Sequence, residues 1–392
     1  MHSADGGTVF LQLDGVTSFI GENPLLVAGF VVGAAVLVLV VALFRRWRQT
    51  SGQRLVKVLA GTDHVAVLMH PNPDPDAMAA GLAVKTLSDG VGTDATIHYP
   101  GQIRHQENRA FETVLDLDFD RIDSAADLPD APVVLVDHNE ARGFSGSESV
   151  EPVAVVDHHP GGGEGTSFTD IRTERGACAS IFAEYFDEMG WETIDPDSQA
   201  ALEEIDHALD PAVATGLLYG IQSDTKSLTK GCSSAEFEAS AYLYPGVDED
   251  KLDRIANPEV DAEVLDTKAA AITQRTVRNA FAVSDVGTIS NVDAIPQAAD
   301  ELLRLEGVTA VVVFGDKEGT IHLSGRSRDD RVHMGKALRA VVEDIPMAGA
   351  GGHARMGGGQ LSIDHMEGLG PREGLTRSQL TERLFESLAG DR

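Results

Sequence analysis

The fold is decided by the stretch 65-VAVLMHPNPDPD-76, in which five apolar residues run directly into alternating polar residues and prolines. Two later stretches, 133-VVLVDH-138 and 153-VAVVDHH-159, also place acidic residues and histidines directly after a short apolar run. Such runs are typical of parallel strands that are buried on both faces. Ligands of open α/β sheets bind beyond the carboxyl ends of the strands. The three stretches therefore predict an α/β fold with a polar site at one edge of a parallel sheet.

The polar residues at these strand ends are of the types that bind metal ions. Asp224, after the apolar stretch 213–221, joins Asp74, Asp76, Asp137 and Asp157 to give five carboxylates for one cleft, beside three or four imidazoles. Five acids cannot all be ionised close together unless cations offset their repulsion, so two divalent metal ions are the expected occupants. Taken singly, an Asp could instead cap a helix and a His could be structural. Only the joint arrangement favours a metal site.

The same motifs resemble the DHH phosphoesterase family of RecJ-like hydrolases. The triplet Asp157-His158-His159 and the upstream 70-HPNPDPDA-77 carry the resemblance in the first part of the chain. Farther on, 324-SGRSR-328, a helix expected over 334–342 and 349-GAGGH-353 resemble, in that order, the DHHA1 substrate domain of nanoRNases and cyclic-dinucleotide phosphodiesterases. The resemblance implies a parallel-sheet DHH catalytic domain over 61–272 and a smaller α/β DHHA1 substrate-binding domain over 273–392.

The resemblance also implies a division of the ligands between two metal ions. One ion would be bound by His70, Asp74 and Asp137, and the other by Asp76, Asp137, His158 and Asp224, so that Asp137 bridges the pair. Mixed imidazole and carboxylate ligation is compatible with Mn²⁺, which the family also suggests, while zinc, cobalt and iron stay open. Hydroxide held between the two ions is the expected nucleophile, attacking phosphorus.

Two further residues are expected to support catalysis. Asp157 would orient its neighbours, and His159 would contact the phosphate or aid proton transfer to the leaving oxygen, although a role in supporting its loop stays open for His159. His138 receives no firm role. For the segment 104–109, substrate binding and a solvated helix face are equal alternatives.

Candidate substrate-binding residues lie in the second domain. Arg326 and Arg328 are expected to grip phosphate, because guanidinium groups bind phosphate in a forked geometry. Gly351 and Gly352 belong to an expected loop whose backbone can approach a ligand closely, with His353 available to contact phosphate or base.

The amino-terminal part of the chain predicts a membrane anchor. Residues 25–44 are twenty consecutive uncharged residues, enough for a helix of roughly 30 Å, which is the thickness of the bilayer hydrocarbon core. Arg45, Arg46 and Arg48 follow directly, so the positive-inside rule places the catalytic domains in the cytoplasm. A cleaved signal peptide would have its basic residues first and a shorter apolar stretch. We therefore expect an extracytoplasmic segment over 1–24, a single-pass cell-membrane helix over 25–44 and a juxtamembrane linker over 45–60.

Composition limits the partners of the chain. Asp and Glu number 62 against 31 Lys and Arg, a formal charge of -31 that is spread along the 392 residues. Such a surface is expected of a halophilic protein, because concentrated salt screens the self-repulsion. Long duplex nucleic acid is bound through clusters of basic residues, and the hydrolase region has no such cluster. The sequence leaves the oligomeric state open, with a homodimer as one alternative.

The expected function is a membrane-tethered two-metal phosphodiesterase that hydrolyses cyclic di-AMP, pApA or short oligoribonucleotides. A pyrophosphatase or polyphosphatase of the same superfamily is the nearest alternative, although it would favour a densely basic second domain. A single-strand exonuclease is a further alternative. A catalytically silent nucleotide sensor would be expected to have a damaged ligand set, whereas every expected ligand is present.

Overall fold

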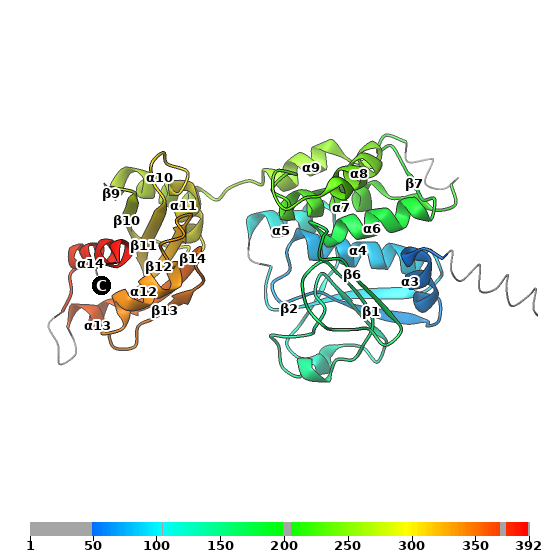
Figure 1. Cartoon of the computed structure of the whole chain (residues 1–392), viewed down its shortest axis with the longest axis horizontal. Helices are drawn as coiled ribbons and strands as arrows, with labels where there is room; N and C mark the ends of the chain where they lie inside the picture. The colour runs from blue at the N-terminus through cyan, green and yellow to red at the C-terminus, as the bar shows by residue number, and fades with distance from the viewer. Residues whose placement is uncertain (1–48, 104, 199–204, 369–373, 391–392) are drawn as a thin grey trace, which may run out of the picture. The chain divides into compact units, whose positions relative to one another are not determined.

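The computed structural model describes residues 49–103, 105–198, 205–368 and 374–390, and the chain divides into two compact units after Pro258 (Figure 1). The division lies before helix α10 (Ala262–Gln274), whereas the sequence placed the boundary at residue 272. This helix belongs to the second unit because Ala271 is fully buried in its core and accepts a hydrogen bond from Ser284 Oγ at 3.0 Å. The expected domain boundary is therefore moved to the linker that precedes α10.

The first unit is built on a parallel sheet of six strands in the order β3-β2-β1-β4-β5-β6. The three apolar runs of the sequence form three of its four inner strands, β1, β4 and β5, so this part of the prediction is confirmed. The strands are β1 (His64–Leu68), β2 (Asp94–Pro100), β3 (Asp120–Ile122), β4 (Val133–Val136), β5 (Pro152–Asp157) and β6 (Phe168–Ile171).

The order of the strands creates a topological switch point between β1 and β4. The chain adds β2 and β3 on one side of β1, then returns to pair β4 with β1 and continues outward through β5 and β6 on the other side. At such a point the loops beyond the carboxyl ends of two neighbouring strands diverge and leave a crevice. The polar residues that follow β1 and β4 therefore meet at this edge of the sheet.

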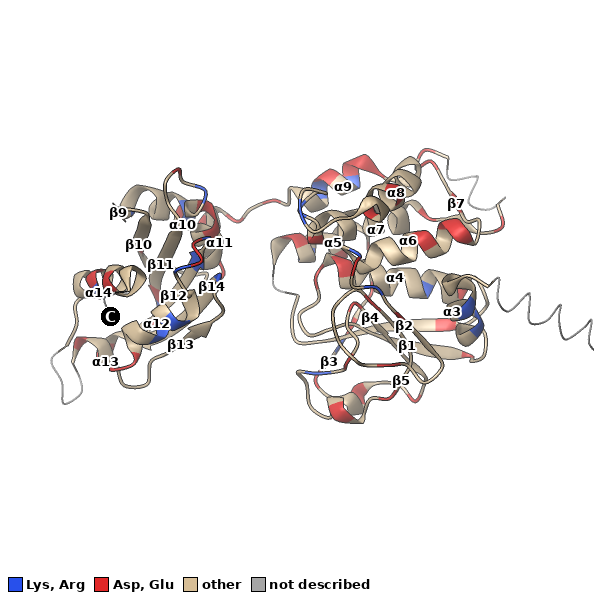
Figure 2. Cartoon of the chain, in the orientation of Figure 1, with Lys and Arg blue, Asp and Glu red and all other residues tan. Residues whose placement is uncertain are grey.

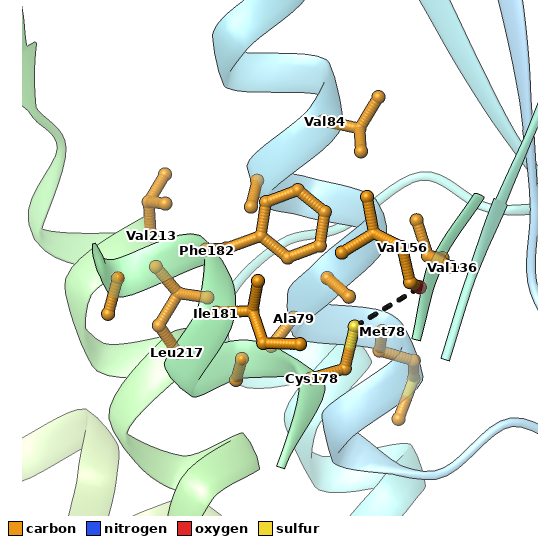
Figure 3. Packing of buried hydrophobic residues seen from close by; sticks show 14 of the residues in the cluster. Met78, Ala79, Val84, Val136, Val156, Cys178, Ile181, Phe182, Val213 and Leu217 are labelled. Carbon is orange, nitrogen blue, oxygen red and sulfur yellow. Dashed lines mark hydrogen bonds between the residues drawn. The ribbon is translucent and has the colours of Figure 1, made fainter. Parts of the chain in front are cut away.

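Helices cover the sheet and build a largely helical layer beyond it. Helix α4 (Pro75–Asp89) packs against α6 (Cys178–Glu188) and α7 (Pro211–Asp224). Figure 3 shows Phe182 and Ile181 of α6 within this core, between α4 and residues of α7, and Cys178 Sγ donating to the carbonyl of Val156 at 3.4 Å. The unit is completed by α5 (Gln106–Val114), α8 (Ser234–Leu243), α9 (Glu249–Ala256) and the short pair β7 (Glu192–Thr193) and β8 (Ala208–Leu209).

Helix α3 (Ser51–Leu59) corrects the expectation of a linker over residues 45–60. Leu55 and Leu59 are fully buried in the core of the first unit, and α3 packs on α6. At Gly52 a Cβ atom would lie 2.8 Å from Cβ of Tyr185, so the helix approaches α6 as closely as glycine allows. Residues 51–59 are thus part of the folded unit. The predicted membrane helix at 25–44 lies outside the described residues, and within the described residues no helix is long and apolar enough to cross a membrane.

The second unit is an α/β domain with a mixed sheet in the order β13-β14-β12-β11-β10-β9. Only β10 and β11 are parallel, and the other pairs are antiparallel. The predicted helix at 334–342 is α12 (Met334–Val342). The other elements are β9 (Thr276–Arg278), β10 (Phe281–Thr288), α11 (Ala294–Leu302), β11 (Ala310–Lys317), β12 (Thr320–Ser327), β13 (Gly349–Gly352), β14 (Met356–Ser362), α13 (Ile363–Glu367) and α14 (Arg377–Ala389).

Acidic side chains are distributed over both units, on helices such as α6 and α9 and on loops (Figure 2). The structure therefore gives no sign, in the part of the chain that it describes, of a single acidic segment set apart from the folded units. This agrees with the even spread of charge along the sequence.

Candidate metal centre

The centre of the site is Asp137, the first residue after β4. Its backbone is in the left-handed region, with φ of 60°, and its N–H donates to the carbonyl of Val156 at 3.0 Å. The residue is only 2% exposed, yet neither carboxylate oxygen has a hydrogen-bond partner among the described residues. Buried polar atoms rarely lack partners in native proteins. Both oxygens therefore mark positions where a ligand is expected.

Two imidazoles face the carboxylate of Asp137, one on each oxygen. His70 Nε2 lies 3.4 Å from Oδ2, and His158 Nε2 lies 3.2 Å from Oδ1. Burial alone would raise the pKa of Asp137, but the neighbouring His158 and His70 outweigh it and hold the pKa well below its usual range. A carboxylate whose two oxygens face different imidazoles has the arrangement expected of a ligand shared by two metal ions.

His70 and Asp74 form the first ligand group with Asp137. The Nδ1 atom of His70 is 3.1 Å from the carbonyl oxygen of Pro71, and its Nε2 atom lies 3.6 Å from Asp74 Oδ2. Asp74 also begins helix α4, because its Oδ1 accepts from the N–H of Ala77 at 3.1 Å. Burial lowers the pKa of His70, yet the carboxylates of Asp137 and Asp74 raise it to about 11. One ligand atom from each of the three residues lies within 4.8 Å of the others.

His158 lies at the centre of the second ligand group. Its Nε2 atom is 3.7 Å from Asp76 Oδ2 and 3.6 Å from Asp224 Oδ2, in addition to its approach to Asp137. Its Nδ1 atom is 3.2 Å from the carbonyl of Arg175. Donation from Nδ1 to that carbonyl would leave the Nε2 lone pair facing the carboxylates, as a metal ligand requires. His158, Asp76 and Asp224 again offer ligand atoms within 4.8 Å of one another.

Asp76 and Asp224 are the carboxylates that are hardest to ionise. Asp76 is completely buried, and burial, followed by the charges of Asp137 and Asp224, raises its pKa well above the ordinary value. Asp224, at the end of α7, has its pKa raised to about 7 by burial and by the charges of Asp74 and Asp137. Both shifts express the repulsion between carboxylates that share one small volume.

The donor set fits divalent cations. Three carboxylates and three imidazoles lie around the oxygens of Asp137, and His159 is the third imidazole, because it offers a ligand atom within 4.8 Å of those of Asp137 and His158. Among the described residues, His158 Nε2 is also buried without a hydrogen-bond partner. Cations would satisfy these atoms and remove the repulsion that raises the pKa values of Asp76 and Asp224. All six predicted ligands are therefore brought to one place, while their assignment to individual ions stays a prediction. The six are His70, Asp74, Asp76, Asp137, His158 and Asp224.

Asp157 and His159 lie beside this cluster. Asp157 is completely buried, and its Oδ1 accepts from the N–H groups of His158 and His159 at 2.7 and 3.0 Å. The same oxygen lies 3.0 Å from His159 Nδ1, which is itself 3.5 Å from Asp137 Oδ1. The hydrogen bond with Asp157 raises the pKa of His159. Asp157 thus contacts its neighbours in the loop, as expected for an orienting residue, and His159 is half exposed next to Asp137.

The structure gives both predicted phosphate-binding arginines partners within their own unit. Arg326 donates from Nε to Asp300 Oδ1 at 2.7 Å, and from a terminal nitrogen to Ser324 Oγ at 3.0 Å. Arg328 donates from Nε to the carbonyl of Val308 at 2.9 Å. Arg328 therefore supports the segment that follows α11, and substrate binding by either arginine stays a prediction.

The glycine-rich segment before His353 is not the loop that the sequence predicted. Its residues 349–352 form strand β13, which pairs with β14 at the edge of the sheet. Gly352 has φ of 138°, and a Cβ at Gly335 of α12 would lie 2.2 Å from the Gly352 carbonyl oxygen. His353 is exposed, and its carbonyl accepts from Gly335 N–H at 3.0 Å. Gly351, Gly352 and His353 thus lie against the start of α12, and their contact with substrate stays a prediction.

The two undecided features receive structural roles. His138 is buried, with Nδ1 2.8 Å from the carbonyl of Val136, and burial lowers its pKa to about 4. In the segment 104–109, position 104 lies outside the described residues and 106–109 begin α5. Asn108 is buried and donates to the carbonyl of Pro73 at 2.9 Å, so this helix supports the loop that carries Asp74.

Sequence reasoning missed the groups that hold the ligands in place. Asn139 donates from Nδ2 to Asp157 Oδ2 at 2.6 Å, and its position directly after Asp137-His138 was the one signal that could have found it. Asp76 accepts from the backbone N–H groups of Cys178 and Ala179 at 2.6 and 2.8 Å. No residue type marks a backbone contact across a hundred positions, so the sequence held no signal for it.

Comparison with known families agrees with this geometry. The model of the DHH family N-terminal domain matches residues 64–221, and the model of the DHHA1 domain matches residues 278–369. The chain combines a DHH domain with a DHHA1 domain. The DHH domain contains all of the candidate metal ligands except Asp224, which follows its matched region by three residues.

Similar proteins match over most of the length of this chain. An uncharacterized protein of Methanocaldococcus jannaschii is 34% identical over 312 residues, which are 79% of this chain and 60% of that protein. The cyclic-di-AMP phosphodiesterase GdpP of Geobacillus thermodenitrificans is 26% identical over 329 residues, which are 79% of this chain and 46% of the relative. The chain thus spans about half the length of these curated relatives. A crystal structure of an exopolyphosphatase-related protein from Bacteroides fragilis shares the fold, with a TM-score of 0.55 and 14% identity over 87% of this chain and 96% of that one.

Proposed function

We propose that this chain is a two-metal phosphodiesterase that hydrolyses small nucleotides. The observation that carries the proposal is the environment of Asp137, a buried carboxylate whose unpartnered oxygens each face an imidazole, with three further carboxylates around it. A purely structural cluster would be expected to satisfy these atoms with hydrogen bonds. A chain that maintains such mutual repulsion in its interior is built to receive cations.

The side chains divide into holding and supporting roles. His70, Asp74 and Asp137 would hold one ion, and Asp76, His158 and Asp224 would hold the second, with Asp137 shared between them. Divalent ions, for which we choose Mn²⁺, would supply an activated water and neutralise charge on the phosphoryl oxygens. Asp137, with its pKa held low, remains ionised over the physiological range and keeps its negative charge at the centre of the site.

His159 is suited to donate a proton to the leaving oxygen. Its Nδ1 atom is paired with Asp157 Oδ1, which leaves Nε2 for a substrate and favours the protonated imidazole. Because 48% of its side chain is exposed, a phosphate ester can approach it from solvent. Protonation of the leaving alkoxide by such a group assists cleavage of a phosphodiester bond.

The charge of the chain and its relatives favour small nucleotides as the proposed substrates. The formal charge of -31 opposes the approach of long nucleic acid, whose binding depends on many basic contacts to phosphates. The relatives described as cyclic-di-AMP phosphodiesterases match over 79% and 85% of this chain, at 26% and 24% identity. Cyclic di-AMP, its linear form pApA and short oligoribonucleotides are therefore proposed as substrates, with Arg326, Arg328 and the 351–353 segment as candidate contacts.

A membrane tether and adaptation to salt are part of the proposal. The uncharged stretch 25–44, followed by three arginines, supports a single-pass anchor with the two domains in the cytoplasm. Washing membranes with alkaline carbonate tests this, since an anchored chain stays in the pellet. Release of the full-length protein into the wash would refute the anchor.

The decisive experiment is hydrolysis by the full-length protein in detergent, with Mn²⁺ and molar KCl. Cyclic di-AMP, pApA, a short oligoribonucleotide, pyrophosphate and bis(p-nitrophenyl) phosphate are compared in parallel. Asp137→Asn removes the charge at the centre of the site, and Asp94→Asn, an exposed acid of β2, is the matched control. We expect turnover of a nucleotide that Asp137→Asn abolishes and Asp94→Asn preserves.

The other results discriminate the alternatives. Cleavage of pyrophosphate with no diester cleavage would assign the chain to the pyrophosphatases. Tight binding of cyclic di-AMP with no turnover of any substrate would indicate a nucleotide sensor. Degradation of long single strands in preference to short nucleotides would indicate an exonuclease.

A further inference from the structure

Asn139 lies at the junction of the two loops that carry Asp137 and His159. It is 8% exposed, and its Nδ2 atom donates to Asp157 Oδ2 at 2.6 Å and to the carbonyl of His159 at 3.3 Å. One amide group therefore binds both the buried carboxylate of the second loop and its backbone. The two loops follow the neighbouring strands β4 and β5, so this contact fixes the position of one loop relative to the other.

Asp157 connects Asn139 to the imidazole of His159. Its Oδ2 accepts from Asn139, while its Oδ1 accepts from the N–H groups of His158 and His159 and lies 3.0 Å from His159 Nδ1. Because Asn139 holds one oxygen and the loop N–H groups hold the other, the Asp157 carboxylate group is fixed in orientation. The imidazole of His159 is thereby held at one orientation beside Asp137.

A glycine-rich segment encloses Asn139 from the other side. A Cβ atom at Gly161 would lie 2.0 Å from Asn139 Oδ1, and one at Gly163 would lie 1.8 Å from the Asn139 carbonyl oxygen. Gly162, between them, has nothing within 4 Å of its Cβ position. No positive φ requires glycine at any of the three positions. Two of the three glycines are thus explained by the space that Asn139 occupies, and the middle one is not.

We propose that Asn139, enclosed by Gly161 and Gly163, is a positioning residue that fixes His159 through Asp157 for proton transfer in the reaction. The inference rests on the proposed hydrolase function. It assigns Asn139 no contact with substrate or metal: among the described residues, the side-chain amide donates to Asp157 Oδ2 and to the carbonyl of His159. Misplacement of a catalytic group by about 1 Å can lower a rate on the order of 100-fold. Loss of the contact should therefore reduce kcat more than it alters KM.

The glycine triplet supplies a test with an internal control. Gly161→Ala places a methyl group where the Asn139 amide lies, whereas Gly162→Ala adds the same group to open space. For hydrolysis of pApA with Mn²⁺, in which the leaving group is a ribose alkoxide that needs a proton, we expect kcat to fall about 10- to 100-fold in Gly161→Ala and to stay within about twofold of wild type in Gly162→Ala. Equal kcat values for the two variants would overturn the proposal.

A reversal of the hydrogen bond provides the second test. Asn139→Asp places two carboxylates against each other, and Asp157→Asn in the same chain restores a donor and an acceptor with their roles exchanged. We expect the double variant to recover part of the kcat lost in Asn139→Asp, a coupling that independent structural roles would not produce. No recovery in a double variant that folds and binds Mn²⁺ would count against the contact.

Two readouts separate this proposal from the proposed function. Mn²⁺ affinity, measured by calorimetry, should change less than about threefold in Gly161→Ala, because none of the six predicted metal ligands is Asn139, Asp157 or His159. Loss of Mn²⁺ binding would mean that the segment maintains the metal site instead of the orientation of His159. Hydrogen exchange of residues 157–163 should be faster in Gly161→Ala than in Gly162→Ala. Faster exchange in Gly161→Ala would support the positioning contact even if the wild type hydrolysed nothing. Absence of hydrolysis by the wild type would refute the proposed function alone. Equal exchange in the two variants would overturn the contact.

Discussion

The carboxylate of Asp76 caps the amino terminus of helix α6, about a hundred residues later in the sequence, because its Oδ2 accepts from the N–H of Cys178 at 2.6 Å. The residue that occupies the cap position, Ala177, has no side-chain group to accept that bond. Asp76 Oδ1 accepts from the next N–H, that of Ala179, at 2.8 Å. Two N–H groups at the open end of a helix favour a negative charge. A candidate metal ligand is therefore also the cap of a core helix.

This double role predicts different effects for two ligand substitutions. Asp76→Ala should abolish Mn²⁺ binding and also lower the free energy of unfolding of the metal-free protein by about 1–3 kcal/mol, because it leaves buried N–H groups without acceptors. Asp224→Ala should abolish Mn²⁺ binding without that loss, since in the described part of the chain its carboxylate is paired with His158 and not with a backbone N–H. Chemical denaturation in EDTA measures both. Equal destabilisation by the two substitutions would contradict the capping role.

Stability of the metal-free protein should fall as pH rises from about 5 to 8. An acid whose folded pKa is raised stabilises the fold while it is protonated, so the contribution of Asp224 is complete below 3.8 and is lost as pH rises through about 7. The contribution of His158 has the same sign, because its pKa is raised from 6.5 to about 10 by Asp137 and Asp76 against the effect of burial. Thermal unfolding in EDTA at three pH values tests this.

Addition of Mn²⁺ should reverse this dependence. The ions compete with protons for the same carboxylates and imidazoles, so their affinity and the stabilisation that they give should increase with pH. The melting temperature with Mn²⁺ minus that with EDTA is therefore expected to grow from pH 5.5 to 8. A difference that shrinks over this range would mean that the metal does not bind to these groups.

Helix α3 should be required for a stable DHH domain. Fully burying a leucine stabilises a fold by about 1.5–3 kcal/mol, and both Leu55 and Leu59 are fully buried. Leu55→Ala in the full-length chain should lower the unfolding free energy by about 2–5 kcal/mol, whereas Val56→Ala, a partly buried neighbour, should cost less. Similar effects of the two substitutions would mean that α3 is only loosely attached.

Concentrated salt should stabilise the chain. Salt shortens the distance over which charges repel one another, from about 10 Å at 0.1 M to about 3 Å at 1 M. With a formal charge of -31, the melting temperature should rise steeply with KCl. Sucrose at equal osmolality leaves the charges unscreened and serves as the control. A protein that is most stable at low salt would refute the prediction of a halophilic protein.

The sequence by itself determined the α/β fold of the first unit and which residues gather in its candidate metal centre. Apolar runs that end in Asp and His can form parallel strands buried on both faces, and the carboxyl ends of such strands lie at one edge of the sheet. Asp137 and His158 could be predicted to meet because each follows directly on its strand. Asp74 and Asp76 share a short proline-rich segment that leaves few other arrangements.

Only the tertiary structure decided how those residues are held. The contact between Asp76 and Cys178 joins groups that are far apart in the chain, and a backbone N–H leaves no mark on the residue type. The burial of Leu55 depends on where α3 docks, which a short amphipathic stretch does not specify. The partners of Arg328 are backbone carbonyls, equally invisible in a sequence. Local pattern encodes which face of an element is apolar, whereas the partner of that face is chosen by the packing of the whole chain.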